Sequence, residues 1–173
     1  MEPAHLRYYR ERQGPWRGRI RFEITDWSAF WAQPMSLLDR LRVLYFALGP
    51  RILGALVVDT SVTLGAGPVV HTVRISRFGF TYYRSRETLA LAPDGQSAQL
   101  EGEAWSLPFF WVGQPMVPGS VWVEAGADAA RYQLHWMGAP LLQTTRTEGE
   151  FLVLTQETAW SRGVWRLRRR AAT

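Results

Sequence analysis

Residues 16–24 constrain the fold most, because apolar and charged side chains alternate there without a break. One set comprises Trp16, Gly18, Ile20, Phe22 and Ile24, and the other comprises Arg17, Arg19, Arg21 and Glu23. Successive side chains of a β-strand point to opposite faces. We therefore predict a strand with one buried face and one solvent face.

A single helical segment, residues 27–50, follows this strand. Asp26 is placed to cap a short turn, and Ser36 is placed to cap a longer helix. Apolar side chains then recur with helical spacing, at Leu37, Leu41, Leu44 and Leu48. Gly49 followed by Pro50 predicts the end of the helix.

The rest of the chain alternates strand patterns with turn signals such as Gly65–Pro68 and Pro93–Gly95. Further strands are predicted at residues 55–64, 69–75, 80–91, 98–105, 117–124, 130–137, 141–147, 150–158 and 164–169. This spacing is typical of an antiparallel meander, which closes to remove its exposed edges. We predict a mainly β protein: an antiparallel up-and-down β-barrel of about eight to ten strands, with a helical lid between the first two strands. Residues 1–173 form one domain in this prediction, and residues 1–13 form a polar leader or short helix.

The aromatic content leaves two interiors open. The chain has nine Trp, six Tyr and eight Phe among 173 residues, and 47% of its residues are hydrophobic. Aromatic side chains line apolar cavities, but they also fill the cores of sheets. The barrel is therefore either hollow, and binds a ligand, or filled, and acts as a scaffold.

The residue types that the sequence lacks exclude several kinds of catalytic and binding site. The sequence contains no Cys, Lys or Asn, which a GC-rich bacterial genome explains, and this excludes disulfides, thiolate nucleophiles and Lys Schiff bases. The histidines, at His5, His71 and His135, have no metal-ligand spacing, so we expect no metal site. Neither a phosphate-binding loop nor a dinucleotide fingerprint occurs, so we expect no cofactor.

The net charge of +5 comes from dispersed arginines rather than one basic patch. Aromatic and basic residues of the first strand lie on opposite faces, whereas single-strand nucleic-acid binders interleave them on one face. We therefore expect no nucleic-acid partner. The sequence has no apolar run of ~20 residues, and residues 1–13 are polar, which favours a cytoplasmic protein without a membrane span. The oligomeric state stays open.

Gly14-Pro15-Trp16, at the start of the first strand, resembles the Gly-x-Trp signature of the calycins, the group of lipocalins and fatty-acid-binding proteins. The resemblance implies a barrel whose Trp stacks under an arginine of the last strand, a role open to Arg166 or Arg168. It also implies a lid like the helices of fatty-acid-binding proteins. The Thr-Asp-Tyr motif of lipocalins is absent, and residues 166–168 read Arg-Leu-Arg where fatty-acid-binding proteins have Arg-x-Tyr.

Several polar residues are candidates for the barrel interior. His71 alternates with Val69, Val73 and Ile75, and Phe80, Tyr82 and Arg84 share one face of the next strand. Gln156 costs less to bury than Glu157, so we place Gln156 inside. Glu101 and Glu103 are expected in solvent. The predicted ligand-binding residues are His71, Phe80, Tyr82, Arg84, Trp105, Trp111, Trp122, Trp136 and Gln156, although the sequence does not orient the tryptophans.

Two functions compete. The first is binding of a hydrophobic small molecule inside the barrel. The alternative is a cofactor-independent isomerase or cyclase acting on a polyketide- or terpenoid-like substrate. Its catalytic residues would be His71, Tyr82 and Arg84, and positioning would supply much of the rate enhancement.

Overall fold

The computed structural model describes residues 2–53, 55–65, 67–106 and 113–170, with residues 50–53 described by their backbone alone. The helices are α1 (Ala4–Glu11), α2 (Trp27–Ala32) and α3 (Leu37–Leu53). The strands are β1 (Gly14–Ile24), β2 (Leu56–Thr63), β3 (Val69–Arg77), β4 (Phe80–Leu91), β5 (Ser97–Ser106), β6 (Gln114–Pro115), β7 (Gly119–Val123), β8 (Ala129–Trp136), β9 (Ala139–Glu148), β10 (Phe151–Glu157) and β11 (Ser161–Arg169).

The strands form a closed antiparallel barrel, which confirms the predicted fold class. Around the ring the order is β1-β2-β3-β4-β5-β7-β8-β9-β10-β11, and β11 pairs with β1 to complete it. On the edge of β5 that faces β7, only residues 97–100 pair with β7. Further along the strand, Glu103 and Ala104 pair with the short strand β6 instead. Helices α2 and α3 connect β1 to β2, as the sequence predicts.

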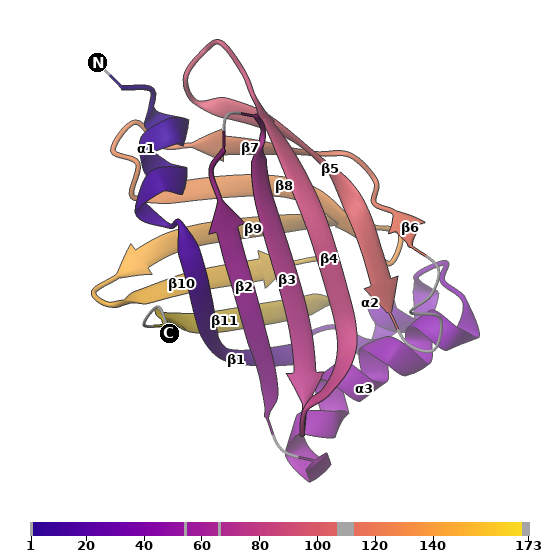
Figure 1. The fold of residues 1–173 in the computed structure, drawn as a ribbon. Helices are drawn as coiled ribbons and strands as arrows, with labels where there is room; N and C mark the ends of the chain where they lie inside the picture. Colours follow the sequence, from indigo (N-terminus) through magenta and orange to yellow (C-terminus); the bar gives the residue numbers. More distant parts are fainter. Residues whose placement is uncertain (1, 54, 66, 107–112, 171–173) are drawn as a thin grey trace.

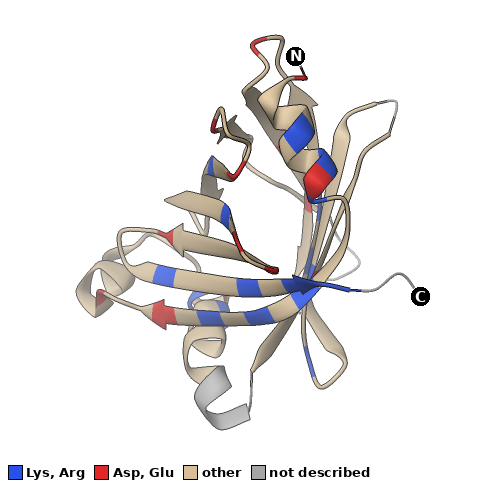
Figure 2. Ribbon diagram, turned by 90° about the vertical axis from the view of Figure 1, so that its left-hand side faces the viewer, with Lys and Arg blue, Asp and Glu red and all other residues tan. Residues whose placement is uncertain are grey.

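Strand β1 has one buried face and one exposed face, as its alternating sequence predicts. Trp16 and Ile20 are buried, and Arg17, Arg19 and Arg21 are exposed. The exposed arginines lie beside those of β11, since Arg17 pairs with Arg168 and Arg19 with Arg166 (Figure 2). Gly18 lets the two strands approach, because a Cβ there would lie 1.9 Å from the carbonyl oxygen of Arg166.

Helix α1 closes one end of the barrel, while α2 and α3 lie at the other end (Figure 1). Residues 1–13 are therefore more than a polar leader. Tyr8 and Tyr9 are almost fully buried and pack against Val69, Leu89 and Leu100. The guanidinium of Arg12 is also buried, where it donates to the carbonyl oxygens of Tyr8, Ala127 and Asp128. The polar composition of residues 1–13 concealed this plug, because its buried face has so few residues.

Helix α3 begins as predicted and ends later than predicted. The hydroxyl of Ser36 accepts from the backbone N–H of Asp39 at 3.1 Å and so caps the first turn. The helix passes through Gly49 and Pro50 to Leu53, although Pro50 cannot donate a helix hydrogen bond. Gly49 makes room for a side chain instead of ending the helix, since a Cβ there would lie 2.8 Å from Nη1 of the buried Arg77.

In the described part of the chain, none of the helices is long and apolar enough to cross a membrane.

Candidate functional site

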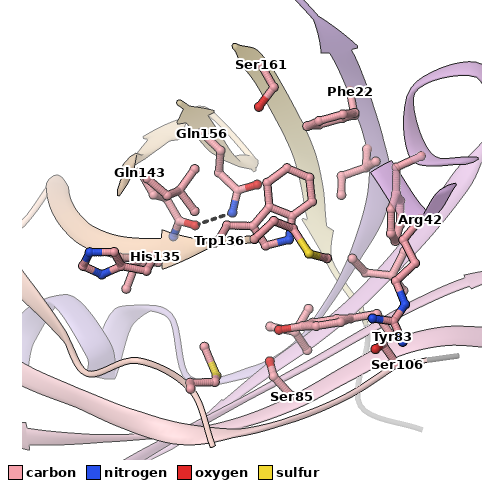
Figure 3. A pocket seen from close by; sticks show the side chains of 18 of the residues that line it. Phe22, Arg42, Tyr83, Ser85, Ser106, His135, Trp136, Gln143, Gln156 and Ser161 are labelled. Atoms are coloured by element: carbon pink, nitrogen blue, oxygen red, sulfur yellow. Dashed lines mark hydrogen bonds between the residues drawn. The ribbon is translucent and has the colours of Figure 1, made fainter. Parts of the chain in front are cut away.

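A cavity of about 580 Å³ lies inside the barrel beneath α3 (Figure 3). Its volume falls in the range of small-molecule sites, ~300–1,000 Å³. Its walls are mainly apolar and include Ile20, Phe22, Val73, Ile75, Leu134, Trp136, Leu141, Leu154 and Trp165. The residues come from both sides of the barrel, so a ligand there would be enclosed by strands far apart in the sequence.

Helix α3 forms the mouth of this cavity. Leu38 and Leu41 line it but are 37% and 55% exposed, so the helix covers the cavity without sealing it. Val43, two residues after Leu41 and so on another side of the helix, is fully buried in one cluster with Phe30 and Trp160 and packs α3 against the barrel. The amphipathic pattern of α3 therefore serves two contacts, one with the core and one with the cavity.

A histidine–carboxylate pair lies on the wall formed by β3 and β4. Nδ1 of His71 lies 2.8 Å from Oε2 of Glu87, and Nε2 lies 2.6 Å from the hydroxyl of Thr60. Ser85 donates to the second carboxylate oxygen of Glu87. Burial raises the pKa of Glu87, but the charge and hydrogen bond of His71 and the hydrogen bond of Ser85 outweigh it, and the net pKa is lowered. Glu87 is thus held as a carboxylate.

A chain of amides occupies the opposite wall. The indole N–H of Trp165 donates to Oε1 of Gln156 at 3.0 Å. The side-chain amide of Gln156 donates to Oε1 of Gln143 at 2.7 Å, as the dashed line in Figure 3 shows. Both glutamines line the cavity.

The mouth carries a second polar cluster. Arg42 of α3 lines the cavity and forms an ion pair with Asp39 at 2.7 Å. The rings of Tyr45 and Tyr82 pack 5.0 Å apart, and Nη1 of Arg77 donates to the Tyr45 hydroxyl at 2.8 Å. Burial, with a hydrogen bond to Tyr82, raises the pKa of Tyr45 to about 12.

The structure brings four of the predicted ligand-binding residues to this cavity: His71, Tyr82, Trp136 and Gln156. Their roles in binding or catalysis stay predictions. Trp111 lies outside the described residues. His135 lines the edge of the cavity and is exposed. Glu101 and Glu103 face solvent, as expected.

The inward placement of Phe80 and Arg84 is wrong. Phe80 is 72% exposed, and Arg84 is exposed with its guanidinium 4.6 Å from the ring centre of Trp105. Phe80 directly follows the tight turn at Phe78 and Gly79, which both have positive φ, at the very start of the strand. For Arg84 the cause is a β-bulge, since Ser76 pairs with Thr81 but Ile75 pairs with Tyr83. Tyr82 is the extra residue, and one extra residue moves every later side chain of the strand to the other face.

Two of the candidate wall tryptophans also lie outside. Trp105 pairs with Arg84 on the outer face of the sheet. Trp122 is 50% exposed, because its neighbours Val121 and Val123 take the inner face of β7. The pattern of residues 121–123 contained this information, because two valines flank the tryptophan.

Sequence reasoning missed several polar cavity residues, among them Tyr83, Ser85, Glu87 and Gln143. The first three follow from the bulge in β4 that displaced Arg84. Burial and the charge of Glu87 raise the pKa of Tyr83, so its hydroxyl stays neutral. Gln143 had a detectable signal, since it alternates with the buried Leu141 and Thr145.

The strand register identifies the arginine that stacks on the signature tryptophan. Trp16 pairs with Arg169, whose guanidinium lies 4.9 Å from the Trp16 ring centre. Arg169 therefore takes the position expected for Arg166 or Arg168, and Arg166 instead lies over Phe151. A closed antiparallel barrel and an arginine stacked on this tryptophan are both features that the resemblance implied.

No family model and no curated protein matches the sequence. Solved structures that it resembles include one titled REP1-NXSQ fatty acid transporter, with a TM-score of 0.48, 8% identity, and 95% of this chain and 99% of that chain covered. A point mutant of the same transporter gives a TM-score of 0.47 and 8% identity, with 94% and 99% covered.

The described residues contain no group of three or more His, Cys, Asp or Glu side chains that could hold a metal ion.

Proposed function

We propose that this protein binds a hydrophobic small molecule inside its barrel. The apolar cavity of about 580 Å³ beneath α3 is the observation that supports the proposal. A few hydrogen-bonding groups, such as Gln143 and Tyr83, interrupt its apolar walls, which is the usual composition of a small-molecule site. The expected cytoplasmic location and bacterial origin stay predictions from the sequence.

A titration with the neutral fluorophore N-phenyl-1-naphthylamine tests the proposal. Adjacent leucines provide a matched pair of variants, because Leu141 lines the cavity and Leu142 is 47% exposed outside it. We expect saturable binding to the unmodified protein and to Leu142→Trp, and at least about tenfold weaker binding to Leu141→Trp, whose larger side chain projects into the cavity and obstructs it.

Leu134→Trp is a second cavity-filling variant, in case Leu141→Trp unfolds. Thermal unfolding of each variant shows whether it is folded. Binding that is absent, or that is equally tight in Leu141→Trp, Leu134→Trp and Leu142→Trp, would contradict the proposal and favour a filled barrel.

The isomerase or cyclase alternative gains no specific support from the geometry of His71. Each ring nitrogen already has a partner, Thr60 at 2.6 Å and Glu87 at 2.8 Å. A general base needs a nitrogen within hydrogen-bond reach of the substrate proton. Catalysis by His71, Tyr82 and Arg84 therefore stays a prediction, and Arg84 points away from the cavity.

A further inference from the structure

The amide chain on the β9–β11 wall has a fixed direction, which begins at Trp165. An indole N–H can only donate, so the group of Gln156 that faces it at 3.0 Å is the carbonyl oxygen. The NH₂ group of Gln156 then faces Gln143, whose carbonyl oxygen accepts at 2.7 Å. Trp165 thus orients both amides, although oxygen and nitrogen are otherwise hard to distinguish.

The chain therefore ends in the NH₂ group of Gln143. This group has two hydrogens, and its described contact is a long one, to the Thr145 hydroxyl at 3.4 Å. Gln143 lines the cavity and is only 7% exposed (Figure 3). A buried donor of this kind is stabilised by an acceptor, and a ligand in the cavity can provide one.

The charges around the cavity do not suit an anionic acceptor at this position. Among the described residues that line the cavity, Glu87 is the one acidic residue, and it is paired with His71. The pair therefore carries a net charge of zero if His71 is protonated and of minus one if it is neutral. Arg42 is paired with Asp39 at the mouth, on the other side of the cavity from Gln143 (Figure 3). Burying a carboxylate without an adjacent cation costs far more than burying a carbonyl.

We propose that Gln143 donates a hydrogen bond to an uncharged acceptor oxygen of the ligand, such as a ketone, ester or amide carbonyl, so that the cavity selects neutral carbonyl compounds over carboxylates. This inference rests on the proposed function. It assigns Trp165 and Gln156 as positioning residues for the Gln143 donor.

Displacement of N-phenyl-1-naphthylamine by ligands of similar chain length tests this selectivity. The three ligands are 2-tridecanone, dodecanoate and tridecane, compared at about pH 8, where dodecanoate is ionised. We expect the ketone to bind at least about tenfold more tightly than the carboxylate. Gln143→Leu should weaken ketone binding about 3- to 10-fold, the range of one neutral hydrogen bond, and should leave tridecane binding unchanged. Gln133→Leu is the matched control, because Gln133 is exposed on β8.

The infrared carbonyl band of ¹³C-labelled 2-tridecanone gives a second readout, which a change in packing alone would not move. A hydrogen-bonded carbonyl absorbs at lower frequency than a free one. We expect the bound ketone to show this lowered band in the unmodified protein and in Gln133→Leu, and to lose it in Gln143→Leu.

The outcomes separate this inference from the proposed function. If the fluorophore does not bind, the proposed function fails and the inference fails with it. If it binds but dodecanoate displaces it as well as the ketone does, the inference alone is overturned. Loss of dodecanoate binding in Arg42→Gln would then assign the ligand's polar end to the mouth. The inference would also be overturned if Gln143→Leu weakened the binding of all three ligands equally.

Discussion

The two ends of this barrel are closed by helices in different ways. At the α1 end, Tyr8 and Tyr9 enter the barrel and pack against side chains that are almost fully buried, including Leu100 and Val121. At the α3 end, the helix covers a cavity of about 580 Å³ and leaves Leu41 half in solvent. Tyr132 marks the boundary, since it lines the cavity and its hydroxyl lies 3.5 Å from those of Tyr8 and Tyr9.

The comparison shows that one barrel can be both filled and hollow. Strands with the same inward alternation form both regions, so the number of apolar residues does not decide which region is packed. The entering segment decides it, because α1 inserts aromatic rings while α3 lies across the opening.

Shortening one leucine at each end of the barrel should have the largest effect on the free energy of unfolding. The two losses should differ if one end is packed and the other is hollow. Leu100→Ala removes a side chain with 1% exposure from the packed end, and we expect a loss of about 3–5 kcal/mol in the free energy of unfolding. Leu141→Ala should cost less, about 2 kcal/mol, because its side chain already borders empty space. Urea unfolding measures both values. Equal losses would mean that the two ends are packed alike.

Removing the charge of Glu87 should have the next largest effect. Glu87→Gln should reduce the free energy of unfolding at neutral pH by about 2–3 kcal/mol, the value of hydrogen bonds to a charged group. The pKa of Glu87 is lowered from its ordinary value near 4.5, so its contribution is present above that value and is lost as the pH falls through the folded pKa.

Urea unfolding between about pH 2 and 7 would show this difference. The unmodified protein should lose stability more steeply than Glu87→Gln below about pH 4.5. The mutation of an exposed carboxylate, Glu101→Gln, provides the control and should leave the profile unchanged. Parallel profiles for Glu87→Gln and the unmodified protein would contradict the placement of this pair inside the barrel.

The contact of Arg169 with Trp16 should have the smallest effect. Arg169→Gln should cost about 0.5–1 kcal/mol in unfolding free energy, the usual value of a cation–π contact at an exposed site. Arg168→Gln is the matched control, because Arg168 forms an ion pair with the exposed Glu150 and should cost less. Thermal unfolding with a change in Trp fluorescence would distinguish the two. A larger loss in Arg168→Gln would favour the arginine that the sequence suggested.

The sequence predicted the barrel because local patterns determine its strands. The alternation in residues 16–24 oriented β1, and the cost of burying Glu157 correctly placed Gln156 inside. The bulge at Tyr82 could not be predicted, since it depends on how β3 and β4 pair, and it reversed the orientation of Arg84. The hollow region was equally inaccessible, because a cavity is a property of strands brought together from the whole chain.

Nuclear magnetic resonance of the backbone amides during titration with 2-tridecanone tests the central claim most directly. The account predicts saturable shifts at residues around the cavity, such as Phe22, Val73 and Leu154, and unchanged signals at Ala98, Val121 and Val123 beside the α1 plug. Shifts of equal size at both ends, or no saturable shifts at all, would contradict a barrel that is packed beneath α1 and hollow beneath α3.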